Sequence, residues 1–124
     1  MPLVLIGLGG AAGAVTRYLV DSWVAQRTAA AFPWGTLVVN VSGSFILGIL
    51  FALAVERDIL PAQSRLPLMV GFIGAYTTFS TLMLESWRLV DGGAIGLALA
   101  NIVGSAVLGL TAVVVGLAVG RAIP

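Results

Sequence analysis

The chain contains no cysteine, no histidine and no lysine, and these absences remove much of the chemistry that enzymes use. Without cysteine there is no disulfide and no thiol nucleophile, and without histidine there is no imidazole metal site and no histidine-based triad. Charged residues are also scarce, at 9 % against about 25 % in an average soluble domain. There is no basic tract to bind nucleic acid. We therefore expect neither an enzyme nor a nucleic-acid-binding protein.

What the chain does contain is apolar, with 60 % hydrophobic residues and a net charge of +1. A soluble protein of 124 residues has a large surface for its volume and needs many charges to cover it. Eleven charged residues cannot do so. The composition therefore predicts a membrane protein, and the length predicts one domain, residues 1–124.

Four stretches carry no charge at all: 1–16, 28–55, 66–84 and 92–120. A membrane-spanning helix needs about 20 apolar residues, and nothing here shows the alternating pattern of a barrel. The chain is therefore predicted to be an all-α integral membrane protein with four spanning helices, at about 3–20, 34–55, 66–89 and 94–119. Short polar segments connect them.

The arginines give almost no instruction about orientation in the membrane. If the N-terminus lies on side one, each side holds three arginines: Arg57, Arg65 and Arg121 on side one, and Arg17, Arg27 and Arg88 on side two. Because the arginine bias of short loops sets orientation, equal numbers favour dual topology. A weak bias decided by something outside this count is the alternative.

The tryptophans fit dual topology, since Trp23, Trp34 and Trp87 all fall at the side-two ends of predicted helices. Two chains packed antiparallel would place tryptophan at both membrane interfaces. An antiparallel two-fold homodimer is also the simplest closed assembly for such a chain. Four helices of this length hardly enclose a pathway alone, which favours a site at the dimer interface.

Three glycine pairs have the four-residue spacing that lets helices approach closely in lipid: Gly9/Gly13, Gly92/Gly96 and Gly116/Gly120. This pattern predicts tight helix packing and says nothing about a ligand.

Polar side chains inside the spans are costly in lipid and often functional. Helix 34–55 carries a stripe with a spacing of four, namely Thr36, Asn40, Ser44 and Gly48, and helix 94–119 carries Asn101 and Ser105 on one face. Hydroxyls of this kind often bond back to their own helix, and an amide such as Asn40 can bond between helices, so structural roles stay open. Arg17 either extends to the lipid headgroups or draws anions to a pathway.

The segment 71–81 is the most informative part of helix 66–89. Gly74 is followed by three threonines and one serine within five residues, and all of these are poor helix formers. The segment predicts a helix broken at mid-membrane, where free carbonyl and N–H groups can hold ions. An intact helix with back-bonded hydroxyls is the alternative.

The interior polar groups favour an anion, because they are amides, hydroxyls, aromatic edges and one arginine, with no deep carboxylate. Glu85 lies near the end of its span, and Asp21 is expected at the end of the first. A small multidrug-resistance-type antiporter shares this size but would need a carboxylate in its first helix. A membrane scaffold without transport activity is the third possibility.

Three strings resemble the Fluc (CrcB) fluoride channels over essentially the whole chain: Gly13-Ala-Val-Thr-Arg17-Tyr, Pro33-Trp-Gly-Thr-Leu-Val-Val-Asn40-Val-Ser-Gly43-Ser and Gly71-Phe-Ile-Gly74-Ala-Tyr-Thr-Thr-Phe79-Ser80-Thr81. The resemblance implies a dual-topology homodimer of antiparallel four-helix subunits in the cell inner membrane. It implies two pores at the interface that export fluoride passively from the cytoplasm. It also implies a structural sodium ion at the two-fold axis, held by the backbone carbonyls of Gly74 and Thr77.

The same resemblance implies a role in the fluoride pathway for seven residues: Asn40, Phe79, Ser80, Thr81, Ser105, Glu85 and Arg17. Asn40 would supply two N–H donors, and Phe79 the positive edge of its ring. The chain departs from the family at Leu82, where a second phenylalanine is typical, and at Asn101, where an aromatic residue is frequent.

Overall fold

The computed structural model describes all 124 residues and consists of helices and short connections. Four helical segments are long and apolar enough to cross a membrane: Pro2–Arg27, Trp34–Glu56, Ala62–Asp91 and Ile95–Ala122. The predicted all-α membrane fold with four spans is therefore confirmed.

Two of the spans are single α-helices, α1 (Pro2–Arg27) and α6 (Ile95–Ala122), and the other two are composite. The second span is α2 (Trp34–Phe51), continued by the π-helical segment η1 (Ala52–Glu56). The third span consists of α3 (Ala62–Arg65), the π-helical segment η2 (Leu66–Ile73), α4 (Gly74–Tyr76) and α5 (Phe79–Asp91).

The first helix is longer than the sequence suggested. It continues past Val20 to Arg27, so that Asp21 lies within α1 and not at its end. Near its end, Arg27 lies over the ring of Trp23, with the guanidinium carbon 4.0 Å from the ring centroid. The expectation that α1 ends near Val20 was wrong, because the charged residues after Val20 limit only the part of the helix that lies in hydrocarbon. The helix itself extends beyond that part.

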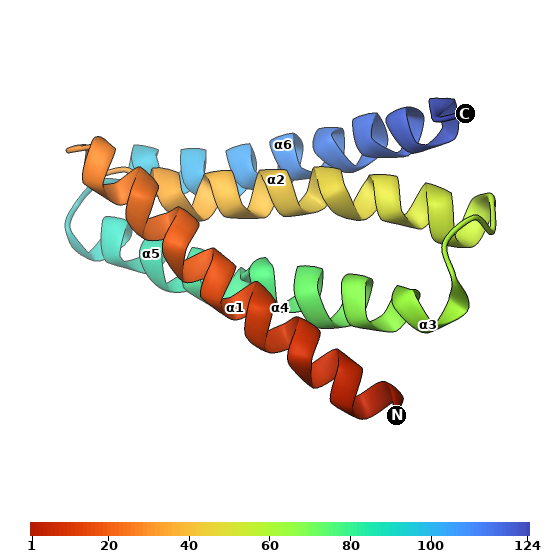
Figure 1. Ribbon diagram of the computed structural model, residues 1–124. Coiled ribbons are helices and arrows are strands. Elements are labelled where there is room, and N and C mark those ends of the chain that lie inside the picture. Colours follow the sequence, from red (N-terminus) through yellow and green to blue (C-terminus); the bar gives the residue numbers. More distant parts are fainter.

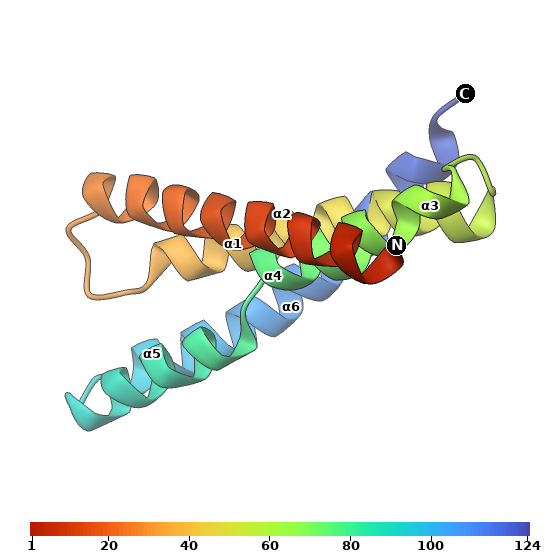
Figure 2. The same ribbon diagram turned by 60° about the horizontal axis from the view of Figure 1, so that its bottom comes forward.

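The spans lie in a bundle with both chain termini at the same end (Figure 1). Helices α2 and α6 lie side by side and run in the same direction, while α1 packs across η2 and α4. Helix α5 packs mainly against the first half of α6 and diverges from the ends of α1 and α2 (Figure 2). Helix α5 begins to diverge at the two non-helical residues that separate it from α4, Thr77 and Thr78; this segment is called the interruption below.

Two of the three predicted glycine pairs make close helix contacts. A Cβ atom on Gly9 or Gly13 would overlap the backbone of η2, at the carbonyls of Pro67 and Phe72 respectively. On α6, a Cβ on Gly116 would overlap the Phe45 carbonyl, and one on Gly120 would lie 2.7 Å from the Ala52 side chain. These contacts fix α1 on η2 and α6 on the second span.

The third pair, Gly92/Gly96, does not mediate helix packing, and that expectation was wrong. Gly92 ends α5, where its backbone N–H donates to the carbonyl of Arg88 at 3.0 Å and the N–H of Gly93 donates to the carbonyl of Val90. A Cβ on Gly96 would meet nothing within 4 Å. The spacing is coincidental here because the turn between α5 and α6 falls between the two glycines.

Candidate functional site

The backbone between α4 and α5 is extended over two residues. Thr77 has φ −80° and ψ 156°, and Thr78 has φ −149° and ψ 116°. Thr78 then acts as the N-cap of α5, since its hydroxyl oxygen accepts a hydrogen bond from the N–H of Thr81 at 3.3 Å. A threonine at this position is a favourable N-cap, so α5 starts as a new helix and does not continue α4.

Asn40 of α2 holds this extended segment with both ends of its amide. Its Nδ2 donates to the carbonyl of Thr78 at 3.0 Å, and its Oδ1 accepts from the N–H of Thr78 at 2.7 Å. The structural role that the sequence left open for Asn40 is therefore real. One N–H of the amide is used in this way, so the expected pair of free donors is reduced to one.

These bonds release two backbone carbonyls from their helical partners. In a continuous helix the N–H of Thr78 would bond the carbonyl of Gly74, and here it bonds Asn40. The N–H of Thr81 would likewise bond the carbonyl of Thr77, and here it bonds the Thr78 hydroxyl. The carbonyls of Gly74 and Thr77 are thereby left to accept from, or coordinate, something else.

A cavity of about 340 Å³ lies beside this interruption, between α2, α5 and α6. It gathers Asn40, Phe79 and Ser105, three residues of the predicted pathway, from three different spans. Its other lining residues are Ser44, Thr77, Thr78, Leu82, Met83, Ile102, Ala106 and Gly109. No charged residue lines it. The hydroxyl of Ser105 is buried and has no hydrogen-bond partner, so it is free to donate to a bound species.

Arg17 and Thr81 lie together in a second cavity, of about 230 Å³, between α1, α2 and α5. Asp21, Thr36 and Thr78 also line this cavity. The Arg17 side chain is half-buried and forms no ion pair or hydrogen bond. Its charge is therefore available to attract an anion toward the interruption.

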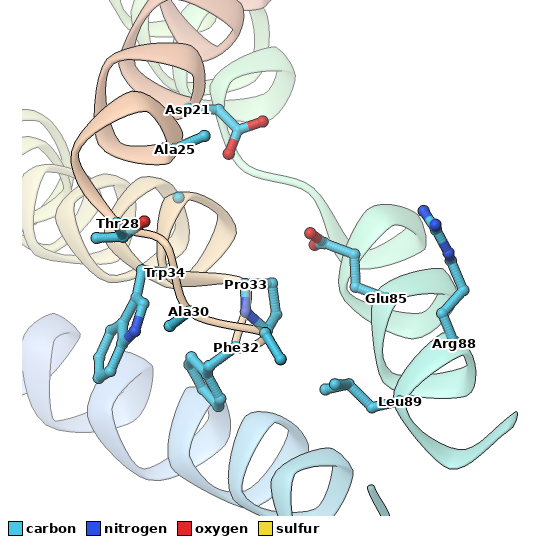
Figure 3. A pocket seen from close by; sticks show the side chains of 12 residues that line it. Asp21, Ala25, Thr28, Ala30, Phe32, Pro33, Trp34, Glu85, Arg88 and Leu89 are labelled. Carbon is cyan, nitrogen blue, oxygen red and sulfur yellow. The ribbon is translucent and has the colours of Figure 1, made fainter. Parts of the chain in front are cut away.

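Glu85 faces a third and wider opening, of about 460 Å³, where α5 diverges from the ends of α1 and α2. Figure 3 shows its carboxylate pointing from α5 toward the helix that carries Asp21, with Arg88 on the other side of α5. Its Oε1 accepts a hydrogen bond from the buried hydroxyl of Thr36. This bond joins residues 49 apart in sequence, so the sequence alone could not reveal it.

Ser80 and Gly74 line none of these cavities. Both are exposed on the surface of the single chain, as is Phe79, whose residue is 73 % exposed. The structure thus divides the predicted pathway residues among three cavities and one exposed surface. Thr36 and Thr78 were visible in the sequence as threonines of polar segments, although neither was assigned a partner.

Comparison with known proteins identifies the family. The family model described as CrcB-like protein, Camphor Resistance (CrcB), matches residues 4–117. The chain belongs to the CrcB family. The resemblance inferred from the sequence is therefore confirmed over nearly the whole chain, and the protein is a multi-pass membrane protein and not an enzyme.

Relatives in the CrcB family are similar along their full length. A protein of Hahella chejuensis named fluoride-specific ion channel FluC is 49 % identical over 98 % of this chain and 95 % of its own. Proteins of the same name from Magnetococcus marinus and Rhizobium meliloti are 46 % and 45 % identical. These alignments cover 99 % and 97 % of this chain, and 100 % and 96 % of the relatives.

Proposed function

We propose that this protein is a fluoride-selective channel of the cell membrane, through which fluoride leaves the cytoplasm passively. Its full-length relatives are named fluoride-specific channels. The observation that carries the proposal is the uncharged cavity at the interruption, where Asn40, Phe79 and Ser105 meet. Donors from three spans surround a space that contains no carboxylate.

The chemistry of this cavity suits a small, strongly hydrated anion. A selective pore must replace the water around the ion with well-placed donors, and must also let the ion leave. The remaining N–H of Asn40 and the free hydroxyl of Ser105 supply donors. The ring of Phe79 supplies a weakly positive edge, which is less retentive than another hydroxyl. Arg17, Thr81, Ser80 and Glu85 extend the pathway beyond it.

The third span is, in this proposal, broken at mid-membrane, and the break holds a structural sodium ion. The support is the pair of carbonyls, Gly74 and Thr77, whose helical partners have been diverted. Carbonyl oxygens suit a hard cation. Two chains related by a two-fold axis would provide four such ligands, and the ion would fix the two interruptions against each other.

We further propose that the functional unit is an antiparallel, dual-topology homodimer with a pore on each side of the interface. The exposed surface at the start of α5 supports this assembly. The exposed Ser80 hydroxyl forms no hydrogen bond, which would be unfavourable against lipid, and the neighbouring Phe79 is 73 % exposed. A partner chain would cover both residues. The arginine counts give independent support, because side one has three and side two has three with Arg17 or two without it, a difference of at most one.

A small multidrug-resistance-type antiporter is the alternative function. Asp21 and Glu85 are its candidate carboxylates, and both line the wide opening at the end of the bundle. An antiporter of this kind would need a carboxylate in the membrane-buried site, where the cavity at the interruption has none.

The experiment is fluoride efflux from liposomes that contain the purified protein, with chloride as the control ion. We expect rapid fluoride efflux, negligible chloride efflux and no dependence on a proton gradient. Reporters fused to the C-terminus should be active on both sides of the membrane. Proton-coupled export of organic cations without fluoride efflux would favour the antiporter, and a reporter active on one side only would contradict dual topology.

A further inference from the structure

Helix α5 is joined to α6 by one buried polar pair that the pathway does not use. Asn101 of α6 is 0 % exposed and Ser86 of α5 is 2 % exposed. The Nδ2 of Asn101 donates to the Ser86 hydroxyl oxygen at 3.0 Å, and that hydroxyl donates to the carbonyl of Leu82 at 2.7 Å. No other side-chain hydrogen bond connects these two helices.

The orientation of the Asn101 amide is fixed by this chain of bonds. Because the Ser86 proton is directed to the Leu82 carbonyl, the Ser86 oxygen can only accept from Asn101. Asn101 must therefore present its N–H groups to α5. Its Oδ1 is left buried without any hydrogen-bond partner.

A buried amide with an unpartnered oxygen is a poor device for stability. Burying such an acceptor costs free energy, and an apolar side chain of the same size avoids that cost. What Asn101 provides and leucine cannot is a directional bond, which fixes the axial and rotational position of α5 on α6.

That position matters for the cavity at the interruption. Helix α5 packs mainly on α6 and touches α2 much less, so α6 is its main support. Leu82, whose carbonyl ends the chain of bonds, lines the cavity together with Phe79 at the start of the same helix. A rotation or shift of α5 would move both side chains relative to Asn40.

We propose that Asn101 is a positioning residue for ion conduction, acting through Ser86 on α5 and through α5 on Phe79. This inference rests on the proposed channel function and adds a residue that lines none of the three cavities described above. Asn101 does not touch the ion. It fixes the position of α5, and with it the distance between Phe79 and Asn40 in the cavity.

The first test is Asn101→Leu, measured as fluoride efflux from liposomes and as the thermal unfolding midpoint of the purified protein. The substitution removes the bond to Ser86 and also the unpartnered oxygen, so we expect an unchanged or raised midpoint. We expect the fluoride flux to fall about tenfold, because the net free energy of roughly one hydrogen bond that positions α5 is lost. Thr111→Ala is the control, because the Thr111 hydroxyl bonds only the Val107 carbonyl of its own helix.

The second test exchanges the partners, with Ser86→Asn and Asn101→Ser in one chain. The new serine on α6 can donate to the carbonyl of Leu97 one turn earlier, as Ser86 does to Leu82. The new asparagine can donate across to it from α5. The exchange restores the bond with the same side-chain volume, and we expect flux within about twofold of wild type, whereas Ser86→Ala alone should stay low.

Wild-type flux in Asn101→Leu overturns the inference, and so does an exchange variant that is stable but does not recover flux. A loss of flux that only follows a loss of stability across the variants also overturns it, because the role is then merely structural. Where Asn101→Leu yields no stable protein, the exchange variant decides. A wild-type protein that conducts no fluoride overturns the proposed function itself, and this inference with it.

Discussion

Replacing Asn40 by alanine should allow the third span to close into a continuous helix at Thr77 and Thr78. In the wild-type structure Asn40 and the Gly74 carbonyl compete for one donor, the N–H of Thr78, and Asn40 holds it at 2.7 Å. Without the amide, that N–H has the Gly74 carbonyl as its natural partner. The carbonyl would then no longer be available to a cation.

The size of the effect follows from the two hydrogen bonds that Asn40 makes to Thr78. Each bond contributes about 0.5–1.5 kcal/mol net. The loss of both therefore lowers the stability of the interrupted form, relative to the continuous helix, by about 1–3 kcal/mol. This corresponds to roughly a 5- to 150-fold change in the equilibrium between the interrupted and continuous forms. The helical bond gained at Gly74 adds to the change in the same direction.

The assay is thermal unfolding of the detergent-solubilised protein with and without sodium, combined with fluoride efflux from liposomes. An ion that binds only the folded protein raises its stability by mass action, so sodium should raise the midpoint of the wild type. Asn40→Ala should lose most of this sodium dependence and most of its flux.

Asn40→Asp separates the two roles of this residue. A carboxylate still accepts from the Thr78 N–H, which keeps that donor away from the Gly74 carbonyl, so the sodium dependence should persist. Its negative charge beside the cavity should nevertheless abolish fluoride flux. If Asn40→Ala keeps wild-type sodium dependence, or if Asn40→Asp conducts fluoride normally, the assignment of Asn40 to both the interruption and the pathway is wrong.

Three further substitutions test the cavity and the packing around it. Phe79→Ile removes the ring edge and should cut fluoride efflux at least tenfold, whereas unchanged efflux would place the pathway elsewhere. Leu82→Phe extends an aromatic ring into the 340 Å³ cavity and should give efflux equal to or above wild type, a result that a blocked pore would contradict. Gly116→Val overlaps the Phe45 carbonyl and should lower stability by about 1–3 kcal/mol in unfolding measurements, while the open position Gly96→Ala should be neutral or slightly stabilising. Equal effects at both glycines would refute the packing argument.

The number and order of the spans could be predicted because the uncharged stretches and the spanning helices nearly coincide. The end of α1 could not, because Asp21 and Arg27 are compatible with a helix that continues past the hydrocarbon. The π-helical segments η1 and η2 were not foreseen either. Their wider turns depend on how the backbone packs against neighbouring helices, and the sequence pattern does not contain that information.

The candidate site was predicted as a set of residue types and not as a set of partners. Asn40, Phe79 and Ser105 line one cavity, and their role in a fluoride pathway stays a prediction. The bond between Thr36 and Glu85 and the bond between Asn101 and Ser86 appear only when the helices are placed side by side. Each is a tertiary contact between common residue types, and no local spacing in the sequence predicts it.

The way in which Asn40 binds Thr78 resembles the pairing of two residues in an antiparallel sheet. A side-chain amide offers one donor and one acceptor with the geometry of a peptide group, and the extended Thr78 uses both, as it would with a neighbouring strand. The interruption is thus a one-residue β-bridge whose second strand is a single side chain. Whether the interruption forms depends more on the residue at position 40 than on the residues at positions 77 and 78. Thr77→Val, which keeps the β-branch and loses only a hydroxyl bonded to the Ile73 carbonyl, should therefore leave the interruption in place.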